Sequence, residues 1–163
     1  MQKDRLVLLS VVKYLKAELL ASGWSNVTFV SQFPDNDNKV VMSGSGDDEV
    51  VIPALTIVPQ DTFILGYAGI GDTTIKSRGY YAIFLYAVSM GQELDLGSFL
   101  CDSLYKGEIN MYPFTSGYPG SPEASIGPIY VESASHSPSY LPHHPNVALR
   151  YGGVVEFTTL IYT

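Results

Sequence analysis

The chain has 163 residues, enough for one domain with its own core, and its 46% hydrophobic content excludes a disordered acidic segment. The net charge of −7 argues against a protein that wraps nucleic acid, because such proteins neutralise phosphates with Lys and Arg. A single cysteine excludes an internal disulfide framework and suits a reducing cytoplasm. The sequence has no run of about 18 apolar residues, so no membrane span is predicted.

The chain opens with a predicted amphipathic helix over residues 4–21. Leu8, Val12, Leu15 and Leu19 recur at helical spacing and form its apolar stripe. Two lysines interrupt the apolar run and no small-residue cleavage site follows closely, which favours a helix over a signal peptide.

Strand candidates follow at 27–33, 39–44 and 50–60, where Pro53 and Pro59 restrict the third to a sheet edge or to the strand ends. The stretch "DNDNKVVMSGSG" invites a calcium-loop interpretation, but it lacks the glycine at position six and the glutamate at position twelve of an EF-hand. Turn chemistry explains it more simply.

Residues 61–78 form a predicted connection with three glycines and few charges. A connection of this length and apolar content does not stay free in water, so it either packs on its own domain or is an arm that docks on a neighbour. Its candidates for subunit contact are Phe63, Ile64, Leu65, Tyr67 and Ile70.

The apolar run at 80–88 predicts a central strand covered on both faces, and a helix follows it. Ser89 and Gln92 have the spacing of a capping box, and Glu93 and Asp95 complement the positive end of the helix dipole. Helix-start chemistry therefore explains the acidic cluster at this junction, and no active site is needed.

The predicted helix ends at Lys106 and Gly107, and Gly97 inside it indicates close backbone packing. Cys101 is interpreted as a packed small residue, because nothing near it in the sequence would lower its pKa enough to make it a nucleophile.

Residues 113–146 are a predicted loop region rich in Pro, Gly, Ser and Tyr, with one short strand candidate at 129–135. His136, His143 and His144 in this region invite a zinc interpretation. Zinc ligands come from ordered elements, whereas these histidines lie among prolines, so no metal or other cofactor is predicted.

The segment 147–163 predicts a final strand inside the sheet, with a bulge at its glycine pair. The glycines at 66–71 reverse the dinucleotide-binding fingerprint, and the sequence carries no catalytic motif. It therefore indicates interfaces rather than chemistry. The low charge and 12 tyrosines leave two interpretations open: a surface covered by other chains, or a β-rich domain that uses Tyr in its strands.

Two stretches resemble head–tail connector proteins of tailed bacteriophages, in particular the tail terminator and neck proteins. The first, "SRGYYAIFLYAVSMGQELDLGSFLCDSL", has an arginine before an apolar strand ending near "YA" and then "GQ" opening an acidic-tipped helix. The second, "LRYGGVVEFTTLIY", is similar to the closing "YR" strand of those proteins. The resemblance covers about a quarter of the chain, and it adds Arg78 and Arg150 to the candidates for subunit contact.

The resemblance implies one α/β domain of the α+β type over 1–163: a mixed, mainly antiparallel sheet flanked by two helices, with a long extended arm. It implies a homo-oligomeric ring, often a hexamer, between the portal or adaptor and the tail-tube proteins, without catalysis, cofactor or membrane. Such a ring is located in the virion and is assembled in the host cytoplasm. It contacts two neighbours through unlike surfaces, which accounts for the low charge and the apolar arm.

DNA would pass through the ring without specific binding, a role that the net negative charge suits. The candidates for acids that face this channel are Asp47, Asp48, Glu49, Glu93 and Asp95. Two alternatives remain: another virion subunit of the stopper, tail-tube or capsid-associated kind, and a small ligand-binding domain or unrecognised enzyme.

Overall fold

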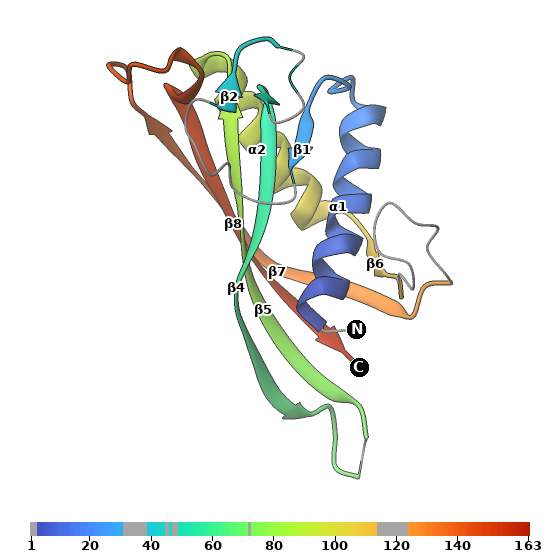
Figure 1. Cartoon of the computed structure of the whole chain (residues 1–163). Helices are drawn as coiled ribbons and strands as arrows, with labels where there is room; N and C mark the ends of the chain where they lie inside the picture. Colours follow the sequence, from blue (N-terminus) through green and yellow to red (C-terminus); the bar gives the residue numbers. More distant parts are fainter. Residues whose placement is uncertain (1–2, 31–38, 45, 47–48, 72, 114–123) are drawn as a thin grey trace.

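The fold is a twisted six-stranded sheet with two helices packed on one face (Figure 1), seen in a computed structural model that describes residues 3–30, 39–44, 46, 49–71, 73–113 and 124–163. The strand order is β1-β4-β5-β8-β7-β6, and only β1 runs parallel to its neighbour. The sheet is therefore mixed and mainly antiparallel, and the predicted α+β fold class is confirmed.

The helices are α1 (Lys3–Ala21), α2 (Met90–Lys106) and the short 3₁₀ helix η2 (Val147–Leu149). The strands of the large sheet are β1 (Thr28–Val30), β4 (Ala54–Tyr67), β5 (Ile75–Ala87), β6 (Ile109–Met111), β7 (Gly127–Tyr140) and β8 (Tyr151–Tyr162). A two-stranded sheet is formed by β2 (Val40–Val41) and β3 (Val50–Val51). Neither of the two described α-helices is long and apolar enough to cross a membrane.

The main core lies between the helices and the inner face of the sheet. Alternate residues of β5 and β8 point into it, among them Tyr81 and Phe157, whose rings stack 5.3 Å apart. From α1 the fully buried apolar residues are Val7, Val11, Leu15 and Leu19. The predicted stripe is thus right for its second half only. Leu8 and Val12 are partly buried beside the core, because the buried face is rotated by one residue in the first turns.

The start of α2 is close to the sequence-based prediction. The Ser89 hydroxyl accepts a hydrogen bond from the Gln92 amide N–H at 3.2 Å, as an N-cap does. The Gln92 side chain reaches back to the Val88 N–H at 2.8 Å, one residue before the position that a capping box uses. The hydrogen bonds of the Ser89 and Gln92 side chains therefore begin α2 at the position that the sequence predicts.

The predicted connection at 61–78 is mostly strand. Residues 61–67 continue β4 and residues 75–78 begin β5, so a single long hairpin joins them, with Phe63 opposite Arg78 and Tyr67 opposite Ile75. A register shift lies at Gly66, whose φ of 120° suits glycine. Figure 1 shows this hairpin running past both termini to a turn at the far end of the molecule.

Two other predictions for the second half of the chain are wrong. The short strand expected at 129–135 extends to Tyr140, although it contains Pro138. That stretch of β7 is the edge of the sheet, because β6 pairs only with Gly127–Ile129, and an edge tolerates proline. The bulge expected in β8 is also absent, since Gly152 and Gly153 pair in regular register with β5.

Candidate subunit interface

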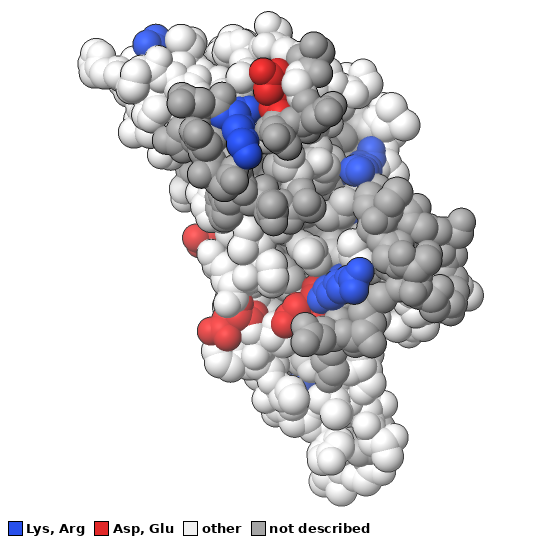
Figure 2. Space-filling model, in the orientation of Figure 1, with Lys and Arg blue, Asp and Glu red and all other residues white. Residues whose placement is uncertain are grey.

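The distal end of the β4–β5 hairpin presents apolar side chains to solvent. We call residues 62–71 the hairpin tip. The tip contains no Lys, Arg, Asp or Glu, and in Figure 2 the corresponding end of the molecule carries no charged colour. Its exposed large apolar side chains are Phe63, Ile64, Leu65, Tyr67 and Ile70, the five that the sequence singled out. A segment of this kind is typical of a protein contact surface.

The base of the hairpin is held by contacts to other elements. The Thr62 hydroxyl donates a hydrogen bond to the carboxylate of Asp4 on α1. The Phe63 ring packs edge-on against Tyr80, with centroids 5.8 Å apart. These contacts position the hairpin relative to the body, while the side chains further out have no such cover.

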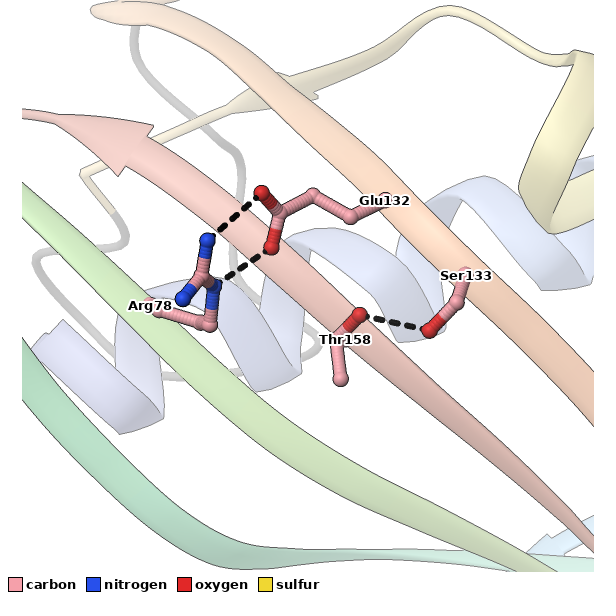
Figure 3. A network of polar contacts seen from close by, with 4 residues as sticks. All are labelled: Arg78, Glu132, Ser133 and Thr158. Atoms are coloured by element: carbon pink, nitrogen blue, oxygen red, sulfur yellow. Dashed lines mark hydrogen bonds and ion pairs between the residues drawn. The ribbon is translucent and has the colours of Figure 1, made fainter.

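Arg78 lies on β5 at the base of the hairpin and makes a two-pronged ion pair with Glu132 of β7 across β8 (Figure 3). Its Nε donates to Glu132 Oε2 at 2.6 Å and its Nη2 to Oε1 at 3.0 Å. The guanidinium lowers the pKa of Glu132. Beside the pair, the hydroxyls of Ser133 and Thr158 are 2.7 Å apart.

The second arginine singled out by the sequence also has a partner within the chain. Arg150 Nε donates to the carbonyl oxygen of His144 at 3.0 Å and so holds the loop before β8. Both arginines thus have a local structural role, and their contact with a neighbouring subunit stays a prediction.

An apolar groove lies between α1 and β1, which we call the α1–β1 groove. Its volume is about 150 Å³. The residues that line it are Leu8, Leu9, Val12, Lys16, Phe29, Val30 and Ile57. The Lys16 ammonium lies 5.4 Å from the centre of the Phe29 ring at its edge. The sequence predicted no groove here, because it depends on the packing of α1 against β1.

The acids expected to face a channel are not equivalent. Glu93 is wholly buried, so its prediction as a channel-facing acid is wrong. Glu49 and Asp95 are exposed, and Glu49 accepts a hydrogen bond from the Gly46 N–H at 3.1 Å. Asp47 and Asp48 lie outside the described residues.

Glu93 is buried because it has partners on β7 that the sequence did not indicate. Its Oε1 lies 2.5 Å from His136 Nε2, and its Oε2 accepts a hydrogen bond from the Tyr140 hydroxyl at 3.1 Å. Two glycines make room for the cluster. A Cβ on Gly97 would lie 2.3 Å from His136 Nε2, and a Cβ on Gly153 would lie 2.2 Å from Glu93 Oε1.

This cluster confirms that Gly97 marks close packing, although the packing partner is a side chain. The close approach of Glu93 also explains glycine at position 153 of β8 without a bulge. The polar groups of Glu93, His136 and Tyr140 are directed at one another, which is the arrangement that a buried polar network needs for stability.

The other titratable residues that the sequence singled out, His144 and Cys101 among them, lie apart from one another. His144 Nδ1 accepts a hydrogen bond from the Asn146 N–H at 3.0 Å, within one turn of the loop. Cys101 is half-buried, and burial, with a smaller effect from Asp102, raises the pKa of its thiol, as expected for a packed residue. Within the part of the chain that the structure describes, no three His, Cys, Asp or Glu side chains lie close enough to hold a metal ion.

A scan against models of protein families and a search of curated proteins find no match for the chain. The assignment of a function therefore depends on the geometry of the hairpin tip, the α1–β1 groove and the buried polar cluster.

Proposed function

We propose that the protein is a structural subunit of the virion of a tailed bacteriophage, of the tail-terminator or neck type. In this proposal, copies of the chain form a ring that joins the portal side of the head to the tail tube and leaves a channel for DNA. The observation that carries the proposal is the uncharged, apolar hairpin tip at one end of the molecule.

The free energy of burial supports a partner for the tip. Moving a Leu, Ile or Phe side chain from water into a protein interior stabilises a structure by about 1.5–3 kcal/mol. The tip exposes several such side chains within ten residues, on a two-stranded ribbon, which is marginally stable when alone. A neighbouring subunit that covers the tip would stabilise both the contact and the ribbon itself.

The geometry of the two apolar surfaces favours a ring over a symmetric dimer. The tip and the α1–β1 groove are different surfaces at separate places on the chain. A contact between unlike surfaces repeats from copy to copy, and it closes into a ring when the rotation between copies allows it. Ring formation from unlike surfaces is what a connector subunit requires.

The polar interior favours a structural role over an enzyme. The buried carboxylate of Glu93 bonds to both His136 and Tyr140, so these polar groups are used within the subunit. A shallow hollow of about 360 Å³ lies over the glycine pair of β8 on the face of the sheet away from the helices. Its lining is mainly apolar, including Phe84, Tyr86 and Leu141. The ligand-binding alternative would place its ligand in this hollow.

The net charge suits passage of DNA. With 9 Lys and Arg against 16 Asp and Glu, the chain has few groups to hold phosphates, and two of its arginines already bond within the subunit. Exposed acids such as Glu49 and Asp95 would keep the channel wall from adhering to DNA. We place the ring in the virion, after assembly in the host cytoplasm.

Electron microscopy of the purified protein tests this proposal. We expect single rings with a central hole, and for six copies a mass of about 107 kDa, six times the 17.8-kDa chain. Stacked tubes would favour the tail-tube alternative. Isolated monomers at micromolar concentration would contradict the proposal.

A further inference from the structure

We propose that the hollow over Gly152 binds a small, uncharged aromatic molecule of up to two fused rings. We call this space of about 360 Å³ the Gly152 hollow. Side chains alternate between the two faces along a strand, and a Cβ on Gly153 would point at Glu93 of α2. Gly152 therefore faces away from the helices. The inference goes beyond the proposed function, because binding in the hollow requires no second copy of the chain.

The missing side chain at Gly152 makes the floor of the hollow. In the sheet, Gly152 pairs with Tyr86 of β5 on one side and with Ser139 of β7 on the other. The φ of Gly152 is not positive, so the backbone conformation does not require glycine. A Cβ there would lie 3.1 Å from the Leu85 carbonyl oxygen, and a longer side chain would occupy the hollow. Glycine at this position keeps the hollow open.

The wall formed by the loop after β7 is held in place by hydrogen bonds within the chain. The Leu141 N–H donates to the carbonyl oxygen of Arg150 at 2.9 Å, and the His144 N–H donates to that of Leu141 at 3.0 Å. The Asn146 side chain donates to the carbonyl oxygen of Val40 at 3.0 Å and so ties the loop to the small sheet. A wall that is already ordered favours binding, because no conformational entropy is lost in forming it.

The side chains around the hollow favour an uncharged ligand. Among the described residues that line it there is no Lys, Arg, Asp or Glu, so a charged ligand would lose water without gaining a counterion. Leu141 lines the hollow and is 51% exposed, and Phe84 is half-buried. An apolar ligand would remove this surface from water.

The size and shape of the hollow favour flat rings. A cavity of about 150 Å³ holds one benzene molecule, so a space of about 360 Å³ is large enough for two fused rings. The rings of Phe84 and Tyr86 supply aromatic surfaces for such a ligand. The polar side chains in the described lining are Tyr86, Ser139 and His144. They suit one or two polar atoms at the edge of a ligand, whereas a sugar would bring several hydroxyls that need partners.

Equilibrium dialysis with indole tests the site, because indole is uncharged, has two fused rings and carries one N–H. We expect saturable binding to the unchanged protein with a Kd below about 1 mM. Glucose should not bind in the same concentration range. Indole-3-acetate, which adds a negative charge, should bind at least about tenfold more weakly than indole.

Two serines of β7 give a matched pair of variants. Ser139→Leu places a large side chain in the hollow and should weaken indole binding by at least about tenfold. The control is Ser135→Leu. Ser135 is exposed on the same face of the same strand but does not line the hollow, so indole binding should stay unchanged.

A second pair of variants tests the rim of the hollow independently. Leu141 and Val147 belong to the same loop and have nearly equal exposure, 51% and 50%, but only Leu141 lines the hollow. Leu141→Asp should weaken indole binding by at least about tenfold, because it puts a charge beside an apolar ligand. Val147→Asp should leave binding unchanged. Circular dichroism identifies the variants that fold, and both pairs are scored on folded protein.

The results separate this inference from the proposed function. The inference is overturned if the unchanged protein shows no saturable indole binding, or if Ser139→Leu and Leu141→Asp bind as tightly as their controls. Tighter binding of glucose than of indole would overturn the aromatic assignment. A native ring that binds no indole contradicts the inference alone, whereas a monomer that binds indole contradicts the proposed function alone.

Discussion

The carboxylate of Glu93 and the imidazole of His136 lie 2.5 Å apart between α2 and β7, and the Glu93 side chain is closed off from solvent. The Tyr140 hydroxyl completes the cluster from the end of β7. The Glu93–His136 pair joins α2, whose start is predicted from the sequence, to β7, whose length is not. This cluster therefore fixes the position of α2 relative to β7.

Replacement of Glu93 by Ala should lower the free energy of unfolding by about 1–3 kcal/mol, because it leaves the partly buried His136 and Tyr140 without their partner. Denaturant titration measures the change. The control is Asp95→Ala on the exposed side of the same helix, which should stay within about 0.5 kcal/mol of the unchanged protein. Equal stability of the two variants would show that the buried cluster contributes nothing.

Replacement of Gly97 by Ala should also destabilise the fold, by about 1–3 kcal/mol, because the new methyl group would overlap the His136 ring and displace it from Glu93. Gly91, in the first turn of the same helix, has open space at its Cβ position. Gly91→Ala should therefore be neutral or stabilising by up to about 1 kcal/mol. Thermal unfolding of both variants makes the comparison, and a Gly97→Ala protein as stable as Gly91→Ala would contradict the packing described.

Replacement of Ser89 by Ala removes the N-cap of α2 and should cost about 1 kcal/mol. The control is Ser98→Ala, in the middle of the same helix on its exposed side, where Ala should be neutral or slightly stabilising. If the two variants unfold at the same denaturant concentration, the Ser89 hydroxyl does not stabilise the helix.

The Arg78–Glu132 pair should make part of the stability depend on pH. The pKa of Glu132 is lowered in the folded protein from its ordinary value of 4.5, so its stabilisation is complete above that value and is lost as the pH falls through the folded pKa. Glu132→Gln should thus be less stable than the unchanged protein at pH 7, and the difference should shrink as the pH falls from 4.5 to 3. The difference should be small and weaken with salt, because both side chains are about one-third exposed, at 34% and 32%. A gap of the same size at both pH values would argue against the ion pair.

The local elements of this fold could be predicted from the sequence, whereas the long-range contacts could not. The start of α2 is encoded within four residues, by Ser89 and Gln92, and its prediction holds. The length of β7 depends instead on pairing with β8, about 20 residues further along the chain, and its Ser- and Pro-rich sequence is typical of a loop. Edge position, which no local pattern reveals, makes that sequence acceptable as a strand.

In the candidate interface, too, the local features could be predicted from the sequence and the long-range contacts could not. The apolar character of the tip is present in ten consecutive residues, so the sequence identifies it. Glu93 is three residues from Met90, at the start of α2, where acids are common on the surface. Its burial depends on His136 and Tyr140, which follow more than 40 residues later. Gly97 and Gly153 were the available signals for that contact, since small residues mark places where another group approaches closely.

The native mass of a matched pair of tip and control variants tests the central claim most directly. Ile64 in the tip and Leu20 on α1 have the same exposure, 68% and 69%, so Ile64→Asp and Leu20→Asp remove similar apolar surface at different places. Light scattering should give a ring mass for the unchanged protein and for Leu20→Asp, and the 17.8-kDa mass of one folded chain for Ile64→Asp. A monomeric unchanged protein, or a ring that persists in Ile64→Asp, would contradict assembly through the hairpin tip.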